Sequence, residues 1–208
     1  MTQAHAEVWR FALIGDTPYS DYERAELPKM LEVIADNQVE FVAHIGDIKS
    51  GKDRCDDSLF DDRHRLFNTS RLPFIYVPGD NEWTDCDRVS SGSYVPAERL
   101  NKLRSLFWSN DLSLGQKKLT LERQRHSRFR IGPVLFVTIN LPGGNNNWGM
   151  TSQPTEEFLN RNPVVLAWLK ENFALARRDK LAGIVLLFQA NPGFTHFSQG
   201  LPHQGYQE

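Results

Sequence analysis

Short apolar runs alternate with amphipathic stretches along the first half of the chain. Runs of strand length lie at 9–14, 39–45 and 73–77. Between them, apolar residues recur at helical spacing over 27–34 and 59–67. Strands that alternate with helices predict βαβ units and a parallel sheet.

Three local signals predict where helices begin or break. Ser20 and Glu23 have the spacing of a capping box, which predicts a helix that begins there. Pro28 falls inside the same stretch, so we expect that helix to be kinked or split. Pro96 suits the first position of a further helix.

The second half of the chain continues the α/β pattern. It predicts strands at 128–131, 134–139 and 184–188 and an amphipathic helix at 163–178. With 40% apolar and 24% charged residues, the composition is that of an ordinary globular protein. We therefore predict a single α/β domain over 1–208.

Charge and hydropathy exclude some classes of partner. The net charge of −2 and the alternating arginines of 123–130, which lack interleaved aromatic residues, give no strong nucleic-acid signal. No apolar run is long enough for a transmembrane helix, so no membrane association is expected. The compartment stays open: cytoplasmic if Met1 is the native start, exported if a leader was removed.

The chain has two cysteines, Cys55 and Cys86, and neither has a close partner that would make a zinc motif. Each follows one of the Gly-Asp dipeptides described next, so their loops could meet over one site. A disulfide and a pair of free thiols both remain open.

Glycine followed by aspartate ends each of the first three predicted strands. Asp16, Asp47 and Asp80 follow one another about thirty residues apart, the length of a βαβ unit. Ligands of open parallel sheets bind beyond the carboxyl ends of the strands, so we expect the three carboxylates in one crevice. A divalent cation would remove their repulsion, and oxygen-rich sites suit Mg, Mn, Ca or Fe. A single Gly-Asp is more often a turn with a helix cap, so this prediction depends on the repeat.

The residues around these dipeptides resemble the successive motifs of calcineurin-like metallophosphoesterases. GDTPY at 15–19, HIGDIKSG at 44–51 and PGDNEW at 78–83 are similar to those of a bacterial branch of this superfamily. The resemblance covers 11–82 well and the strand that ends at Gln189 less closely. It implies a sandwich of two β-sheets flanked by helices and phosphoester hydrolysis with divalent Mn, Fe, Mg or Zn.

The resemblance also implies roles for individual residues. Asp16 would bind the first metal and Asp47 would bridge two metals. Asp80 and Gln189 would bind the second metal, in place of the family's Asn and His. Asn81 stands where the family has the His that protonates the leaving group. Asparagine transfers no proton at neutral pH, so Asn81 could only donate a hydrogen bond to phosphate.

The chain departs from the family pattern at several ligands. Pro18 stands where the family has a metal-binding His, and no G-H-x-H occurs before Glu208. We therefore expect either a fragment that is incomplete at its C-terminus or a degenerate relative. His196 and His203 in the polar tail could substitute for missing ligands.

Three further polar residues have both a functional and a structural interpretation. Lys49 could neutralise a substrate phosphate near Asp47, or it could be a solvated lysine. Asn145 lies in a loop that could line the substrate cleft or form a plain turn. His44 is interpreted as a packed histidine at a strand end.

Two hypotheses about function follow. The first is a metal-dependent hydrolase of a phosphorylated small molecule or ester, with Asp16, Asp47 and Asp80 at the metals. The second is a phosphoesterase-like module that binds a phosphate ligand without turnover. A nucleotide-binding domain ranks last, because the chain has neither a P-loop nor a G-x-G-x-x-G motif.

Overall fold

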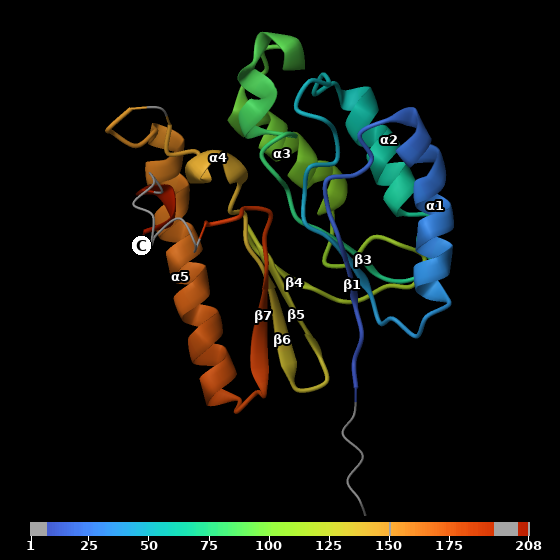
Figure 1. Cartoon of the computed structure of the whole chain (residues 1–208). Helices are drawn as coiled ribbons and strands as arrows, with labels where there is room; N and C mark the ends of the chain where they lie inside the picture. Colours follow the sequence, from blue (N-terminus) through green and yellow to red (C-terminus); the bar gives the residue numbers. More distant parts are fainter. Residues whose placement is uncertain (1–7, 150, 194–203, 208) are drawn as a thin grey trace, which may run out of the picture.

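The computed structural model describes residues 8–149, 151–193 and 204–207. Two β-sheets with helices on their outer sides form the described part, as Figure 1 shows. The three-stranded sheet is parallel and has the order β1 (Ala12–Ile14), β2 (Val42–His44), β3 (Phe74–Tyr76). The four-stranded sheet has the order β4 (Glu122–Arg123), β5 (Ser127–Ile131), β6 (Val134–Thr138), β7 (Gly183–Leu187). The predicted α/β class and the parallel first sheet are confirmed.

The second sheet is mixed. Strand β5 pairs antiparallel with β4 and β6, whereas β6 and β7 run parallel. The helices are α1 (Asp21–Ala35), α2 (Asp57–Phe67), α3 (Pro96–Phe107), α4 (Gly143–Asn146) and α5 (Glu156–Arg178). The described residues also form the short 3-10 helices η1 (Thr84–Asp87), η2 (Val89–Ser91) and η3 (Gln204–Tyr206).

The helix α1 begins where the capping box predicts. The Ser20 hydroxyl accepts a hydrogen bond from the Glu23 backbone N–H at 3.2 Å, and the Glu23 carboxylate accepts one from the Tyr19 backbone N–H. Of the two outcomes predicted for Pro28, a kink or a split, the split is wrong, because α1 runs through it as one helix. Leu27 and Leu31 are buried against the first sheet, and this packing outweighs the backbone hydrogen bond that proline lacks.

The helix α5 begins at Glu156 rather than at Pro163. The Thr155 hydroxyl caps it by accepting from the Phe158 backbone N–H at 3.1 Å. Phe158 and Arg161 are both buried, so tertiary packing also holds the turns that precede the proline. The sequence placed the start too late because proline is common at the first helical position.

The two sheets pack face to face around an aromatic cluster. Phe41 lies beside β2, and its ring meets Phe129 of β5 and Phe136 of β6 edge-on, with centroids 5.1 and 5.0 Å apart. Ile75 of β3 and Leu187 of β7 belong to the same buried cluster. The apolar faces of both sheets are thus shared, and neither sheet could bury this surface alone.

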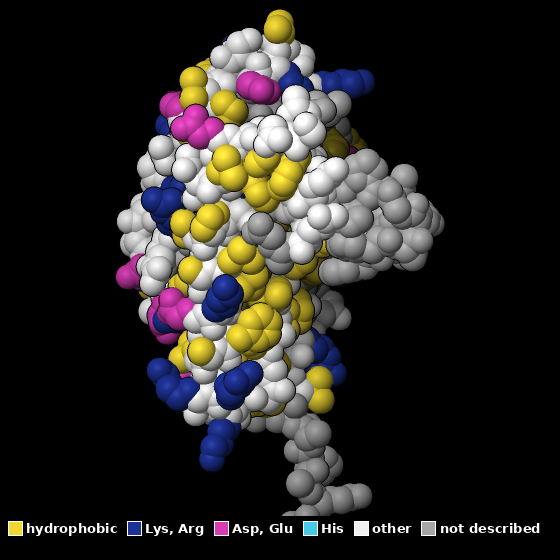
Figure 2. Space-filling view, turned by 90° about the vertical axis from the view of Figure 1, so that its left-hand side faces the viewer, with side chains coloured by type: hydrophobic (Ala, Val, Ile, Leu, Met, Phe, Trp, Pro, Cys, Tyr) yellow, Lys and Arg dark blue, Asp and Glu magenta, His cyan; other side chains and the backbone are white. Residues whose placement is uncertain are grey.

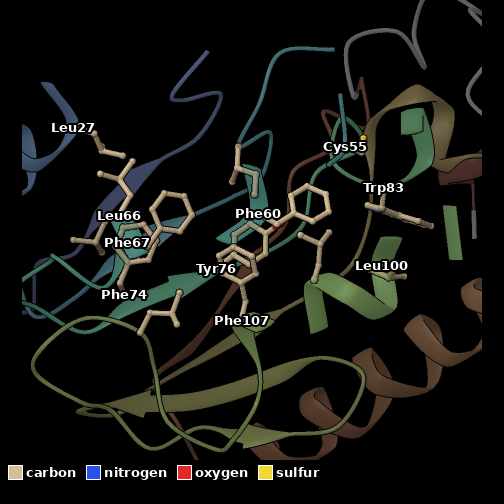
Figure 3. Packing of buried hydrophobic residues seen from close by; sticks show 14 of the residues in the cluster. Leu27, Cys55, Phe60, Leu66, Phe67, Phe74, Tyr76, Trp83, Leu100 and Phe107 are labelled. Carbon is tan, nitrogen blue, oxygen red and sulfur yellow. The ribbon is translucent and has the colours of Figure 1, made fainter. Parts of the chain in front are cut away.

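Helices cover the outer face of each sheet. Figure 3 shows the rings of Phe67, Phe74, Tyr76 and Phe107 packed between the first sheet and α2 and α3. On the other side, Trp168 and its neighbours on α5 pack on β6. Figure 2 shows that the outward face of α5 carries hydrophobic side chains, with Lys and Arg gathered towards its C-terminal end. No helix in the described segments is both long and apolar enough to cross a membrane.

The parallel register brings the Gly-Asp dipeptides to one edge. Ile14, His44 and Tyr76 lie opposite one another as the last residues of β1, β2 and β3. The Asp16 backbone N–H donates to the Gly46 carbonyl at 3.1 Å, which extends the pairing into the turns. The strand-end turns are therefore neighbours.

A disulfide joins Cys55 and Cys86, with their Cα atoms 5.8 Å apart. It ties the segment before α2 to the 3-10 helix η1. Of the two alternatives that the sequence left open, the structure has the disulfide, with both sulfur atoms 3.7 Å from the Asn81 carbonyl oxygen.

His44 is a packed residue, as expected. It is fully buried, its Nε2–H donates to the Thr17 carbonyl at 2.7 Å, and its Nδ1 accepts from the Gly46 N–H at 3.2 Å. Burial lowers the pKa of His44 to about 4. Both ring nitrogens serve the structure, so neither is free to bind a ligand.

This burial predicts a pH-dependent contribution to stability. The folded pKa of His44 lies below its unfolded value, so the folded state binds fewer protons and the stabilisation is lost as pH falls from about 6.5 towards 4. Between about pH 7 and pH 5 the wild type should lose about 2 kcal/mol relative to His44→Gln, which keeps an amide donor and acceptor but does not titrate. Urea unfolding of both proteins at the two pH values measures this difference, and parallel pH profiles would contradict it.

Candidate functional site

Two of the predicted aspartates converge on one side chain from the second sheet. The Gln189 Nε2 group donates to Asp47 Oδ2 at 3.1 Å and to Asp80 Oδ1 at 3.0 Å. Asp47 and Asp80 follow β2 and β3, whereas Gln189 follows β7. The centre is thus built where the ends of both sheets meet, and an amide spans the two carboxylates.

A buried carboxylate fixes the two turns that carry these aspartates. Glu82 accepts hydrogen bonds from the Asp47 backbone N–H at 3.1 Å, from the Gly79 N–H at 2.8 Å and from the Tyr76 hydroxyl at 2.9 Å. Glu82 is fully buried. It therefore holds the end of β2 and the end of β3 at a fixed separation.

Glycines allow these turns to approach closely. A Cβ on Gly79 would lie 2.1 Å from Asp47 Oδ1, and one on Gly46 would lie 2.3 Å from the Gly79 nitrogen. A Cβ on Gly143 of α4 would lie 2.7 Å from Asp80 Oδ2. Gly46 and Gly79 also meet backbone atoms, so only glycine fits in these two turns, whereas a side chain at Gly143 would displace the Asp80 carboxylate.

The backbone at the aspartates is also special. Asp16 and Asp47 have φ angles of 54° and 58°, in the left-handed region. Aspartate tolerates this conformation better than most residues, because its short polar side chain can hydrogen-bond locally. The aspartates therefore serve the turn geometry as well as any chemistry.

Burial among carboxylates makes the centre electrostatically costly. Desolvation, then Glu82 and Asp80, raise the pKa of Asp47 to about 9. Desolvation raises the pKa of Glu82 to about 7, against the stabilising hydrogen bonds from Gly79 and Tyr76. A cation beside Asp47 would favour its ionised form.

Lys49, two residues after Asp47, is a buried lysine close to the carboxylates of the centre. It is 0% exposed, so the interpretation of Lys49 as a solvated lysine is wrong. Burial lowers its pKa, while the carboxylates of Glu82 and Asp53 act in the opposite direction. Its Nζ donates to the Ser50 carbonyl at 3.0 Å. Lys49 is thus placed to compensate the acidic centre from inside the protein.

Asp16 joins the centre through a chain of polar groups. The Tyr19 hydroxyl donates to Asp16 Oδ1 at 2.9 Å and accepts from Asn81 Nδ2 at 3.3 Å. Asn81 Nδ2 also donates to the Lys49 carbonyl at 3.1 Å, and the Asn81 backbone N–H donates to Asp47 Oδ1 at 3.2 Å. Burial and the nearby carboxylates, Asp47 first, raise the pKa of Tyr19, so the hydroxyl keeps its proton.

Within the described segments, no three His, Cys, Asp or Glu side chains are grouped to hold a metal ion. For Gln189, a predicted metal ligand, Oε1 accepts a hydrogen bond from the Gly143 N–H and Nε2 donates to the two carboxylates. Both polar atoms of this amide thus make hydrogen bonds within the protein, and metal binding by Gln189 stays a prediction.

The remaining predicted residues lie around this centre or outside the described segments. Asn145 has its side chain bonded to Gln204 and to the Gly205 backbone N–H, so it holds η3 in place. His196 and His203 lie outside the described residues.

Sequence reasoning assigned no role to three residues of the centre. Tyr19 and Glu82 stand in the GDTPY and PGDNEW motifs that carried the resemblance, so the motifs contained them without giving their function. Gly143 had only the signal of a Gly-Gly pair after a strand. Its contact with Asp80 comes from the folding of a distant segment.

Comparison with known proteins adds evidence on the fold. No protein-family model matches the chain, and no curated protein sequence matches it. Among solved structures, the chain is similar to GAP50, the anchor in the inner membrane complex of Plasmodium, with a TM-score of 0.52 and 15% identity. The match covers 95% of this chain and 62% of that chain, so the chain spans less than two thirds of the length of GAP50. At this identity the likeness concerns the fold alone.

Replacing one carboxylate oxygen of Glu82 by an amide nitrogen tests whether Glu82 holds the two turns. Glu82→Gln keeps the shape but leaves one acceptor oxygen for the backbone donors of Asp47 and Gly79, so we expect a loss of about 2–3 kcal/mol in unfolding free energy. Urea denaturation measures it, with the exposed Glu40→Gln as the matched control. Equal stability of the two variants would show that Glu82 does not hold the turns.

The close approach at Gly79 gives a second test. Gly79→Ala places a methyl group against Asp47, so we expect a loss of about 1–3 kcal/mol in stability. The variant should also lose any Mn-induced rise in the unfolding temperature that the wild type shows. Gly183→Ala is the control, because a Cβ there meets no atom within 4 Å. Gly79→Ala with the stability of the wild type would refute the tight contact.

Proposed function

We propose that the strand-end centre is the active site of a metal-dependent phosphoester hydrolase with the calcineurin-like sandwich fold. The observation that carries the proposal is the convergence of Asp47 and Asp80 within 3.1 Å of one nitrogen atom. The motif resemblance at 15–19, 44–51 and 78–83 supports the same proposal of a phosphoester hydrolase. Two packed sheets with helices outside are consistent with such a sandwich.

The donor set fits one hard divalent cation. Asp47 and Asp80 offer carboxylate oxygens, and the raised pKa of Asp47 marks a carboxylate that lacks a compensating charge beside it. Magnesium-like ions are often held by one or two carboxylates, with waters and substrate phosphate completing the shell. Such an ion would polarise a phosphoryl oxygen and lower the pKa of a bound water.

The protein's own groups would position the substrate and balance its charge. Lys49 is a buried lysine on which the carboxylates of Glu82 and Asp53 act, so it would contribute positive charge near the centre. Asn81 donates a hydrogen bond to the Tyr19 hydroxyl, which donates to Asp16, so these two residues connect Asp16 to the centre. Asn81 would release its bond to Tyr19 or to Lys49 before it could donate to phosphate.

The second candidate function is phosphate binding without turnover. The observation that favours it is Gln189, whose Nε2 lies between the two carboxylates where a ligand atom is required. Asn81 in the place of a proton donor agrees with it, because an amide transfers no proton. The two candidates share the site and differ in chemistry.

Turnover of an aryl phosphate separates the candidates. With 4-nitrophenyl phosphate and added Mn, we expect metal-dependent release of nitrophenol that falls about a hundredfold or more in Asp47→Asn, since a charged ligand is lost. Asp111→Asn, at an exposed loop position, is the matched control.

Three outcomes are informative. Metal-dependent turnover that Asp47→Asn abolishes supports the hydrolase. Mn binding that depends on Asp47 without any turnover supports the binding module. Turnover that is independent of metal, or unchanged in Asp47→Asn, would place the chemistry elsewhere and refute both candidates.

A further inference from the structure

A cavity lies between α3 and α5, and the strand-end carboxylates are not among the residues that line it. Its volume is about 370 Å³, within the range of small-molecule sites. Trp83, Leu100 and Val164 give it an apolar wall, and Arg104, Arg125 and His126 line it as well. Trp83 and Leu100 are both labelled in Figure 3, where they border the main core.

Two residues that line this cavity carry a buried donor with no acceptor among the described residues. Trp83 is 0% exposed, and its indole Nε1 has no hydrogen-bond partner there. The Nε of Arg104 is likewise buried without a partner in the described part of the chain. Buried polar groups are nearly always paired, so an unpartnered donor on each of two lining residues leaves this wall of the cavity with unused hydrogen-bonding capacity.

His126 adds a third donor. It is 3% exposed, and its Nδ1 accepts from the Asn140 backbone N–H at 3.2 Å. The proton of the neutral ring is therefore on Nε2. Burial, and after it the positive charges of Arg104 and Arg161, lower the pKa of His126 to about 3, so the ring stays neutral.

Charge in the cavity favours an anion. The guanidinium of Arg161 already has partners within the protein, because it donates hydrogen bonds to Glu157 and to the side chain and carbonyl of Asn146. Arg104 and Arg125, by contrast, form no ion pair within the described segments. Burial, and after it the positive charge of Arg125, lowers the pKa of Arg104, whereas Glu157 raises it. Glu156 and Glu157 line the cavity too, so its lining carries three arginines against two glutamates, and this excess of positive charge attracts an anion to Arg104 and Arg125.

We propose that this cavity binds a small organic anion, with its phosphate or carboxylate head at Arg104 and Arg125 and its apolar part against Trp83 and Leu100. The inference does not depend on metal chemistry at the strand ends. Trp83 follows Glu82 directly in the chain, so the PGDNEW segment borders both sites.

Titration of the whole chain, treated with EDTA, tests the proposal. The probes are phenylphosphonate, benzoate and inorganic phosphate, followed by calorimetry and by the fluorescence of the tryptophans. We expect saturable binding of phenylphosphonate or benzoate, with the tighter probe identifying the head group, and weaker binding of inorganic phosphate, which has no apolar part. Arg125→Gln and Arg104→Gln should each weaken binding by about tenfold or more, as expected for a charge-assisted hydrogen bond.

Two control variants define the site. Arg177→Gln, an exposed arginine in the last turn of α5, should bind as the wild type does. Asp47→Asn should also leave binding unchanged, because it alters only the strand-end centre. Arg125 is exposed, so its variant should fold even if Arg104→Gln does not. Absence of saturable binding, wild-type affinity in Arg125→Gln, or an equal effect of Asp47→Asn would each overturn the proposal.

Discussion

The buried carboxylate of Glu82 is the constraint on which the candidate centre depends. It accepts hydrogen bonds from the backbone N–H groups of Asp47 and Gly79, which follow β2 and β3, and from the hydroxyl of Tyr76. Unpaired, each of these buried groups would destabilise the fold by an amount comparable to a lost hydrogen bond. Because Glu82 satisfies them together, the two turns take one relative position, and Asp47 and Asp80 are brought side by side.

This arrangement concentrates acidic side chains in a buried environment. The raised pKa values of Asp47 and Glu82 show that the fold accepts an electrostatic penalty there. Lys49 offsets part of it from within the protein, and Gln189 offers two donor hydrogens from the other sheet. Sites that keep such a penalty are commonly functional, because ligand binding relieves it.

Positively charged side chains lie on the other side of the PGDNEW segment from the carboxylates. Glu82 faces the strand ends, whereas Trp83 lines the cavity that also contains Arg104 and Arg125. The centroid of the Trp83 ring lies 5.7 Å from the Arg161 guanidinium, and Arg161 in turn holds Asn146 at the end of α4. The same helix places Gly143 against Asp80. The acidic centre and the basic cavity therefore share supporting elements, although their ligands would differ.

The sequence by itself determined the α/β class, the parallel first sheet, most of the helices and the positions of the Gly-Asp turns. These features depend on hydrophobic period and on local backbone preference, which neighbouring residues encode. It also brought Asp47 and Asp80 to one sheet edge, because parallel strands end together.

Only the tertiary structure decided what the side chains do. It buried Lys49, joined Cys55 to Cys86, gave Glu82 its three donors and turned the nitrogen of Gln189 towards the carboxylates. The disulfide, the bond from Asp47 to Glu82 and the bonds from Gln189 to the two aspartates each join segments that are separate in the chain. Their geometry follows from how the two sheets and their helices pack, and no local pattern records it.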